Sequence, residues 1–436
     1  METMMKKVYD CFQVADILLP PESADISKWA VIACDQYTSE PEYWRECASH
    51  IGHAPSTYRC ILPEAFLSDA TPKKIASIND TMRDYLYNYL KCYRNTMIYV
   101  RRTLKNGSVR TGIVGTVDLE EYDYSPASKS LIRATEGTVL ERIPPRVHIR
   151  RGAPLELPHI MMLIDDPGRT VIEQVEPSGT PVYDGELYSG GHITGWVLDT
   201  EACERVRKAL SGLAEPCRLA DMYGSDKDPL IFAVGDGNHS LATAKTCWEE
   251  IKRSLTKEEM ANHPARRALV ELVNLHDASL EFEPIYRLVM GVDPGRLISA
   301  LTLYAQENSR NELLPACHQV IYYKSYGTKG EVHFTKAPHM LTVGTLDAFL
   351  EEYISSSPGK KPVVDYIHGI ENLNRLAESR RDTVGFSFTG MKKSELFASV
   401  IKYGPLPRKT FSMGSADDKR YYVEARRIKT DAELSV

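Results

Sequence analysis

A stretch that runs from an apolar strand through two glycines into a helix limits the folds open to this chain more than any other feature. It occupies residues 229–250, PLIFAVGDGNHSLATAKTCWEE. Residues 230–234 are apolar and favour a buried β-strand, and apolar side chains then recur at a helical spacing, at Leu241, Ala244 and Trp248. The residues between these two elements are Gly235, Asp236, Gly237, Asn238, His239 and Ser240. We therefore expect a strand that passes into a helix through a short polar loop.

The remainder of the chain alternates between helical and strand-like patterns. Apolar residues recur on one helical face in residues 72–93 and in residues 201–213. The stretches that favour strands are residues 95–119, with a hairpin turn at residues 105–108, residues 159–177, with a turn at Asp166-Pro167-Gly168, and residues 266–277. Because strands interleaved with helices are typical of α/β proteins, we expect a mixed α/β fold.

Length and composition indicate a soluble globular protein. The 436 residues are 43% hydrophobic and 26% charged, and this length suffices for two or three domains. We expect an N-terminal α/β region over residues 1–125, a core over residues 126–290 and a C-terminal α+β region over residues 291–436.

The same composition argues against several classes of partner. A net charge of −6 does not suggest a nucleic-acid-binding protein, and no run approaches the ~18 apolar residues of a membrane span. The nine cysteines form no CxxC pair, and polar residues interrupt any apolar leader near the N-terminus. We therefore expect a cytoplasmic protein with reduced cysteines that binds neither nucleic acid nor a membrane.

The glycine loop predicts an anion site. Glycines before a helix let backbone N–H groups approach a ligand without a Cβ in the way. The first N–H groups of a helix have no intrahelical partner and lie at the positive end of the helix dipole, an arrangement best suited to phosphate. The simpler interpretation, that Asn238 or Ser240 only caps the helix, stays open. A carboxylate, Asp236, and an imidazole, His239, in the same loop favour a functional site.

The segment VGDGNHSLATAK, residues 234–245, resembles the D-G-H-H-R signature of DUF1015, a bacterial and archaeal family of unknown function. Asn238 stands where the signature has its first His, and Ser240 stands where it has Arg, so one expected phosphate contact is absent. The resemblance spans most of the chain, because three more segments are similar to the same family: GTVDLEEYDY at residues 115–124, RATEGT at residues 133–138 and PLPRKTFSMG at residues 405–414.

The family signature in turn is similar to the phosphate loop of the ParB and sulfiredoxin superfamily. That superfamily includes CTP-binding partition proteins, ATP-using sulfiredoxins and free serine kinases. The resemblance implies a ParB/sulfiredoxin-like core with flanking N- and C-terminal α/β regions. It also implies nucleotide phosphate binding at the loop, by Gly235, Gly237, Asn238 and Ser240.

Phosphoryl transfer fits these residues better than the other activities of the superfamily. Sulfiredoxin places a reactive Cys just before the motif His, and here that residue is Asn238. Partition proteins need basic DNA-reading helices, whereas the helix after the loop carries mixed charge. We therefore predict a kinase that uses ATP or another nucleotide with Mg²⁺ and acts on the hydroxyl of a small polar metabolite, such as a hydroxy amino acid. The alternative is a nucleotide-binding regulatory protein of the ParB-like type without metabolite chemistry.

A kinase needs cationic groups on the phosphates, usually carboxylates for Mg²⁺, and a base near the acceptor hydroxyl. We expect Glu136 to be the base, Asp236 to hold Mg²⁺ and His239 to donate to a phosphate oxygen. The arginines of residues 131–152 are expected to fold over the phosphates and to replace the missing Arg. The assigned arginines are Arg133, Arg142 and Arg146. A surface position for Glu136 and a solvated basic loop for the arginines are the simpler alternatives.

Overall fold

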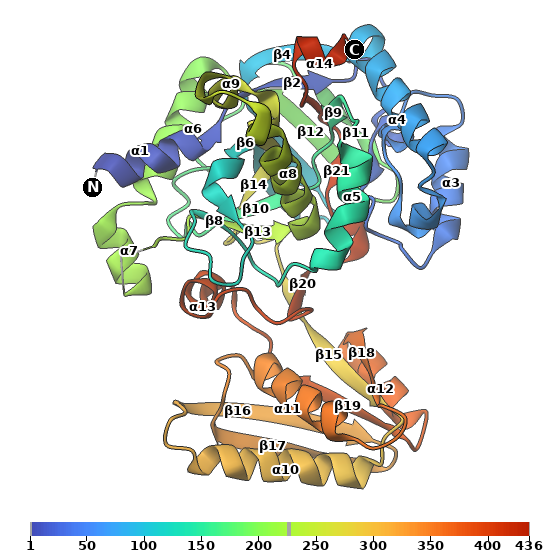
Figure 1. Cartoon of the computed structure of the whole chain (residues 1–436), viewed down its shortest axis with the longest axis vertical. Helices are drawn as coiled ribbons and strands as arrows, with labels where there is room; N and C mark the ends of the chain where they lie inside the picture. Colours follow the sequence, from blue (N-terminus) through green and yellow to red (C-terminus); the bar gives the residue numbers. More distant parts are fainter. Residues whose placement is uncertain (1, 225–227, 436) are drawn as a thin grey trace. The chain divides into compact units, whose positions relative to one another are not determined.

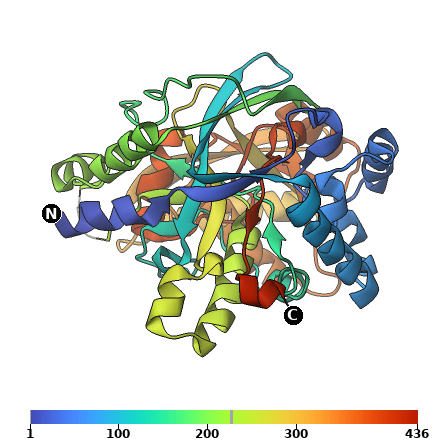
Figure 2. The same cartoon turned by 90° about the horizontal axis from the view of Figure 1, so that it is seen from above.

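A computed structural model describes residues 2–224 and 228–435. The chain divides into two compact units (Figure 1). Unit 1 consists of Met1–Leu280 and Gly414–Val436, and unit 2 consists of Glu281–Met413. The start of the first helix and the end of the last one lie at different edges of unit 1 (Figures 1 and 2).

Unit 1 is built on one large mixed sheet. Its strand order is β11-β12-β5-β6-β14-β10-β13-β8-β7, and β1 pairs with β6. The pairs β14–β10, β13–β8 and β8–β7 are parallel, and the other neighbours are antiparallel. The strands are β1 (Phe12–Gln13), β5 (Ile98–Thr103), β6 (Val109–Asp118), β7 (Tyr122–Asp123), β8 (Ile132–Ala134), β10 (Met161–Ile164), β11 (Tyr183–Leu187), β12 (Gly191–Val197), β13 (Phe232–Asp236) and β14 (Arg267–Asn274).

Both faces of this sheet are covered by apolar cores. Because side chains alternate along a strand, Ile113 contributes to one core and its neighbour Val114 to the other. The first core includes side chains of α1, α6 and α8, and the second includes side chains of α2, α3 and α4. The helices of unit 1 are α1 (Glu2–Cys11), α2 (Ile26–Trp29), α3 (Pro41–Ile51), α4 (Pro72–Asp84), α5 (Ile143–Arg150), α6 (Thr200–Gly212), α7 (Pro216–Tyr223), α8 (Asn238–Ile251), α9 (Lys257–Asn262) and α14 (Asp431–Leu434).

Most elements expected from the sequence are present. The strand and the helix are confirmed as β13 and α8, but the polar connection is shorter than expected, because β13 continues to Asp236 and α8 starts at Asn238. The hairpin turn at residues 105–108 joins β5 to β6. The hairpin expected over residues 159–177 is wrong, because only its first half forms a strand, β10. The Asp166 carboxylate accepts the backbone N–H groups of Thr170 and Val171, and this local bonding replaces the ladder of a second strand.

The C-terminal tail returns to unit 1 and pairs with segments from the first half of the chain. β21 (Tyr421–Tyr422) is antiparallel to β3 (Val31–Ile32), and β22 (Arg426–Arg427) is antiparallel to β9 (Leu155–Glu156). A further two-stranded ladder joins β2 (Ala15–Leu19) and β4 (Lys91–Thr96). The β21–β3 pair brings residues near 420 beside a segment almost four hundred residues earlier in the chain.

Unit 2 contains an antiparallel sheet in the order β17-β16-β19-β15-β18, with β20 paired to β15. Aromatic packing joins Tyr304 of α10 to Phe334 of β17 and to Phe349 of α11. Its elements are β15 (Phe282–Met290), α10 (Pro294–Arg310), β16 (Ala316–Ser325), β17 (Thr328–Lys336), α11 (Thr342–Ser356), β18 (Val363–His368), α12 (Ile370–Glu378), β19 (Thr383–Phe388), α13 (Leu396–Tyr403) and β20 (Phe411–Met413).

The two units confirm the mixed α/β class expected from the sequence. Residues 98–118 and 161–274 contribute strands to the same sheet, so segments of the expected N-terminal region and of the expected core share one unit. Within the described ranges, no helix combines the length and apolar character needed to cross a bilayer.

Candidate functional site

The parallel strands β8 and β13 bring two predicted site segments together. Arg133 pairs with Ala233 and Ala134 with Val234, so both strands end at the same edge of the sheet. Beyond that edge, the Thr135 hydroxyl donates to the Val234 carbonyl at 2.7 Å. The loop that carries Glu136 therefore lies beside the loop of residues 235–240.

A second contact ties these loops together. The backbone N–H of Val139 donates to His239 Nε2 at 3.2 Å, so the neutral ring carries its hydrogen on Nδ1. Glu136 and His239, which were assigned from distant parts of the sequence, thus belong to one pair of adjoining loops. Both side chains are half-buried.

Gly237 sets the geometry of the loop. Its φ is +80°, and a Cβ at this position would lie 3.0 Å from the Ile160 Cα. A larger residue would therefore have a strained backbone and would also be crowded by the backbone of Ile160. Helix α8 begins directly after Gly237, with no side-chain cap and no acidic residue in its first turn. Its first N–H groups are positioned to bind an anion.

Asp236 is held at the start of this loop by two contacts. Its Oδ1 accepts the backbone N–H of Gly237 at 2.8 Å, and Lys419 Nζ lies 3.4 Å from its Oδ2. Lys419 belongs to the returning C-terminal tail, so tertiary structure alone places this cation here. Next to it in the loop, Asn238 Oδ1 is buried and has no hydrogen-bond partner among the described residues.

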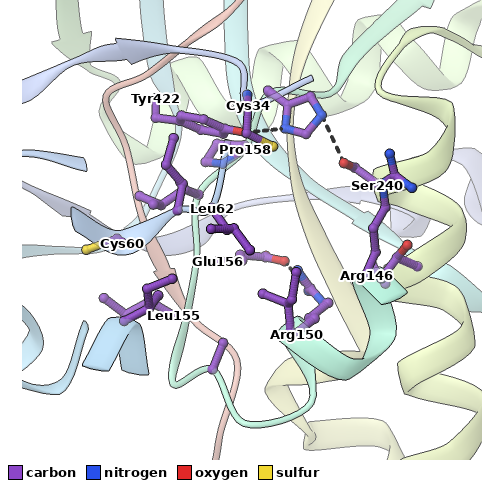
Figure 3. Close-up of a pocket in the computed structure, with 18 of the residues that line it drawn as sticks. Cys34, Cys60, Leu62, Arg146, Arg150, Leu155, Glu156, Pro158, Ser240 and Tyr422 are labelled. Carbon is purple, nitrogen blue, oxygen red and sulfur yellow. Dashed lines mark hydrogen bonds and ion pairs between the residues drawn. The ribbon is translucent and has the colours of Figure 1, made fainter. Parts of the chain in front are cut away.

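The hydroxyl of Ser240 takes part in a chain of hydrogen bonds (Figure 3). Ser240 Oγ lies 2.9 Å from His159 Nε2, and His159 Nδ1 lies 2.9 Å from the Tyr422 hydroxyl. The Tyr422 oxygen also accepts the backbone N–H of Cys34 at 3.1 Å. His159 and Tyr422 are almost fully buried, whereas Ser240 is half-buried at the end of the chain.

A cavity of about 160 Å³ adjoins the first turns of α8, and Ser240, His159 and Tyr422 line part of it (Figure 3). Its remaining walls come mainly from residues 60–67, α4, α5 and the segment before β10, and most of their side chains are apolar. Those apolar side chains include Leu62, Ile78, Met82, Ile149, Leu155 and Leu157.

Two arginines that line this cavity are already paired with carboxylates. Arg146 forms an ion pair with Glu64, and Arg150 forms one with Glu156. Burial acts to raise the pKa of Glu156, but the charges of Arg426 and Arg150 outweigh it and hold that pKa below its usual value. Both guanidiniums in the cavity wall are therefore already engaged by carboxylates of the protein.

The side-chain contacts of Arg133 lie away from the loop. Arg133 is buried, and its guanidinium donates to the main-chain oxygens of Ser130, Asp228 and Pro229. These residues lie at the end of β13 opposite to residues 235–240. Arg142 is exposed, and its carbonyl accepts a hydrogen bond from Arg146.

Asp35, at the end of β3, is electrostatically linked to this site. Burial acts to raise the pKa of Asp35, but His159, the side-chain amide of Gln36 and Lys419 outweigh it and lower that pKa. The adjacent Cys34 shows the opposite shift, because burial raises the pKa of its thiol to about 12. A carboxylate and a neutral thiol therefore flank Tyr422.

Sequence reasoning missed His159, Lys419 and Tyr422. His159 precedes a strand and carries no motif, and the other two lie in a tail that pairs with β3. The sequence offered one signal for His159: Ser240 replaces the Arg of the family signature, and a serine at this position needs a different hydrogen-bond partner.

Within the part of the chain that the structure describes, no group of three His, Cys, Asp or Glu side chains is arranged to hold a metal ion. A nucleotide-bound Mg²⁺ needs only one or two protein carboxylates, because the phosphates supply other ligands. Asp236 is a half-buried carboxylate in the glycine loop, and it is able to supply such a ligand.

A family model described as "Protein of unknown function (DUF1015)" matches residues 15–430. No curated protein matches the chain. Among solved structures, a free serine kinase in complex with AMP is 10% identical with a TM-score of 0.37, and the match covers 72% of this chain and 90% of that one.

Two further solved structures show a comparable likeness. A conserved hypothetical protein from Pyrococcus furiosus is 10% identical with a TM-score of 0.34, covering 72% of this chain and 94% of that one. SbnI with a C-terminal truncation from Staphylococcus aureus is 10% identical with a TM-score of 0.36, covering 74% and 92%. Likenesses at this level carry no argument about activity.

Proposed function

The chain belongs to the DUF1015 family, and on that premise we propose that it is a nucleotide-dependent phosphotransferase acting on the hydroxyl of a small polar metabolite. The observation that carries the proposal is the uncapped first turn of α8, reached through the left-handed Gly237, with Lys419 beside it. Backbone N–H groups and a cation at one place are what a nucleotide phosphate requires.

The loop binds the phosphates mainly through its backbone in this proposal. Gly235 and Gly237 let the chain approach the phosphate oxygens, and the N–H groups of Asn238 and Ser240 point along the start of α8. The Ser240 side chain is turned to His159, so its backbone rather than its hydroxyl serves the phosphate. His239, anchored by Val139, contacts a phosphate oxygen.

Lys419 takes the role that the sequence suggested for the arginines. The Arg133 guanidinium donates to carbonyl oxygens at the far end of β13, and Arg146 is paired with Glu64. Lys419 is largely buried and lies within 3.4 Å of the Asp236 carboxylate. It therefore adds a positive charge beside the loop.

Two carboxylates have the remaining roles, metal binding and proton acceptance. Asp236 would hold Mg²⁺, which neutralises charge on the transferred phosphoryl group when it is bound. Glu136, on the adjoining loop, accepts the proton of the acceptor hydroxyl as that oxygen attacks phosphorus. The parallel pairing of β8 and β13 supports this division, because it places the two carboxylates on neighbouring loops.

The first test is thermal unfolding of the full chain with a panel of nucleoside mono-, di- and triphosphates, with and without Mg²⁺. A nucleotide present at 100 times its Kd stabilises a protein by about 2.7 kcal/mol, which raises the midpoint by several degrees. His239→Ala and Lys419→Met should reduce this rise, and Lys402→Met, in unit 2, should preserve it.

If no nucleotide raises the midpoint, or if both loop variants respond like the wild type, the proposed phosphate site is wrong. Binding without transfer to any amino acid, sugar or polyol of a broad panel would instead favour a nucleotide-binding regulator.

A further inference from the structure

Ser240, His159 and Tyr422 have the arrangement of an activated serine nucleophile. A nucleophile and its base lie within about 2.6–3.2 Å of each other in such sites, and a third group orients the base. Here the Ser240–His159 distance is 2.9 Å, and the Tyr422 hydroxyl holds the other ring nitrogen at 2.9 Å. The proposed phosphotransferase uses none of these three side chains as a reacting group.

We propose that Ser240 is an acyl-accepting nucleophile with His159 as its general base, and that the adjoining cavity takes the short apolar acyl group of a carboxylic ester. The substrate class is an uncharged ester of a small aliphatic acid. This activity does not depend on nucleotide binding.

The cavity favours an acyl group over a phosphoryl group. Most of its lining is apolar, and its two arginines, Arg146 and Arg150, are held in ion pairs with Glu64 and Glu156. A dianionic group would have to compete with these carboxylates for the guanidiniums, whereas an aliphatic chain would bury its surface against the apolar side chains. The volume of about 160 Å³ limits the chain to a few carbons.

The hydrogen bonds specify how the proton moves. When His159 Nδ1–H donates to the Tyr422 oxygen, Nε2 is the acceptor for the Ser240 hydroxyl. As the Ser240 oxygen attacks the ester carbon, His159 takes its proton, and the C–O bond to the alcohol breaks. The alcohol leaves with the proton from Nε2, and water then hydrolyses the acyl-serine by the same steps in reverse order.

The surroundings also suit the charge that develops during attack. Ser240 lies in the first turn of α8, where backbone N–H groups lack intrahelical partners. Such donors stabilise a negative oxygen on a tetrahedral carbon.

The test uses a fluorophosphonate probe on the full-length folded protein, followed by peptide mass spectrometry. We expect the probe on Ser240, no label there in Ser240→Ala, and labelling about 10²–10⁴ times slower in His159→Asn. Ser254→Ala, which removes an exposed hydroxyl at the end of the same helix region, should label like the wild type.

A second test measures ester hydrolysis by the full-length protein. p-Nitrophenyl acetate and butyrate should be cleaved faster than the octanoate, because the cavity holds only a short chain. Circular dichroism of each variant separates loss of reactivity from loss of folding, and His159→Gln is the substitute if His159→Asn unfolds. Absence of the label from Ser240 in the folded wild type, or equal labelling of Ser240 in wild type and a folded His159 variant, would overturn the proposal.

Discussion

Two helices in different units of the molecule each begin after a glycine with a positive φ. α8 follows Gly237 and α12 follows Gly369; both glycines have φ near +80°, and neither helix start has a side-chain cap. Their surroundings differ. The first turn of α12 contains an acidic residue, Glu371, whereas the first turn of α8 contains none and has Lys419 near its loop.

The difference shows what turns a helix start into a candidate site. A carboxylate in the first turn compensates the positive end of the helix dipole, and this applies to α12. At α8 the first turn has no such carboxylate, and the surrounding segments add Lys419, Glu136 and a cavity. A Cβ at Gly237 would meet Ile160, whereas a Cβ at Gly369 would meet nothing within 4 Å. A glycine with a positive φ is therefore tightly packed at the start of α8 and open at the start of α12.

The largest expected effect concerns the two glutamates near these helix starts. Glu136→Gln should lower phosphoryl transfer by about 10²–10⁴-fold, because it removes the base while leaving a side chain of the same shape. Nucleotide-induced stabilisation should change little. Turnover with the acceptor found in the panel measures the first effect, and thermal unfolding measures the second.

Glu371→Gln is the matched control, since Glu371 is exposed in the first turn of α12. It should leave turnover unchanged. Full activity in Glu136→Gln would remove that residue from the mechanism.

Substitution of the two glycines should have a smaller effect, and it should distinguish loss of stability through backbone strain from loss of nucleotide binding. Gly237→Ala and Gly369→Ala each force a non-glycine residue to a positive φ, which costs about 1–3 kcal/mol of unfolding free energy. Only Gly237→Ala should also reduce the stabilisation by nucleotide, because only that loop contacts phosphate. Urea unfolding with and without nucleotide measures both quantities. An equal loss of nucleotide stabilisation in both variants would contradict the proposal that nucleotide binds at Gly237.

The smallest expected effect is the pH dependence of Asp35. Its pKa is lowered in the folded protein, so its carboxylate stabilises the fold above the ordinary value near 3.9, and this contribution is lost as the pH falls through the lowered pKa. The difference in unfolding free energy between wild type and Asp35→Asn should therefore be constant near neutral pH and shrink below about pH 4. Unfolding of both proteins between pH 3 and 7 measures it, with the exposed Glu42→Gln as control. A difference that grows on acidification would contradict the assignment.

Local sequence was enough to predict the main elements of the candidate site. The apolar run before Gly235 and the helical spacing after Ser240 predicted β13 and α8, because each pattern reflects one buried face. The glycines predicted a short connection between them, and the structure shows that Gly237 makes it with a positive φ. These features depend on residues a few positions apart, whose mutual geometry is set by backbone sterics.

The hairpin expected at Asp166 shows where local patterns fail. Turn residues between two apolar runs predict a hairpin, but the Asp166 side chain binds the backbone that would have formed the second strand. The arginines of residues 131–152 show the same dependence on tertiary partners. Charge density predicts where cations are in the sequence, whereas Arg133 and Arg146 found carbonyl and carboxylate partners that no local pattern reveals.

The sequence by itself determined the strand, the glycine turn, the helix and the family to which the chain belongs. Tertiary structure alone decided which side chains meet there. Pairing of β8 with β13 brought Glu136 to the loop, and pairing of β21 with β3 brought Lys419 and Tyr422 from the far end of the chain. The physical reason is that backbone conformation is set by near neighbours, whereas the charge, burial and hydrogen bonds of a site come from segments joined only when the sheet assembles.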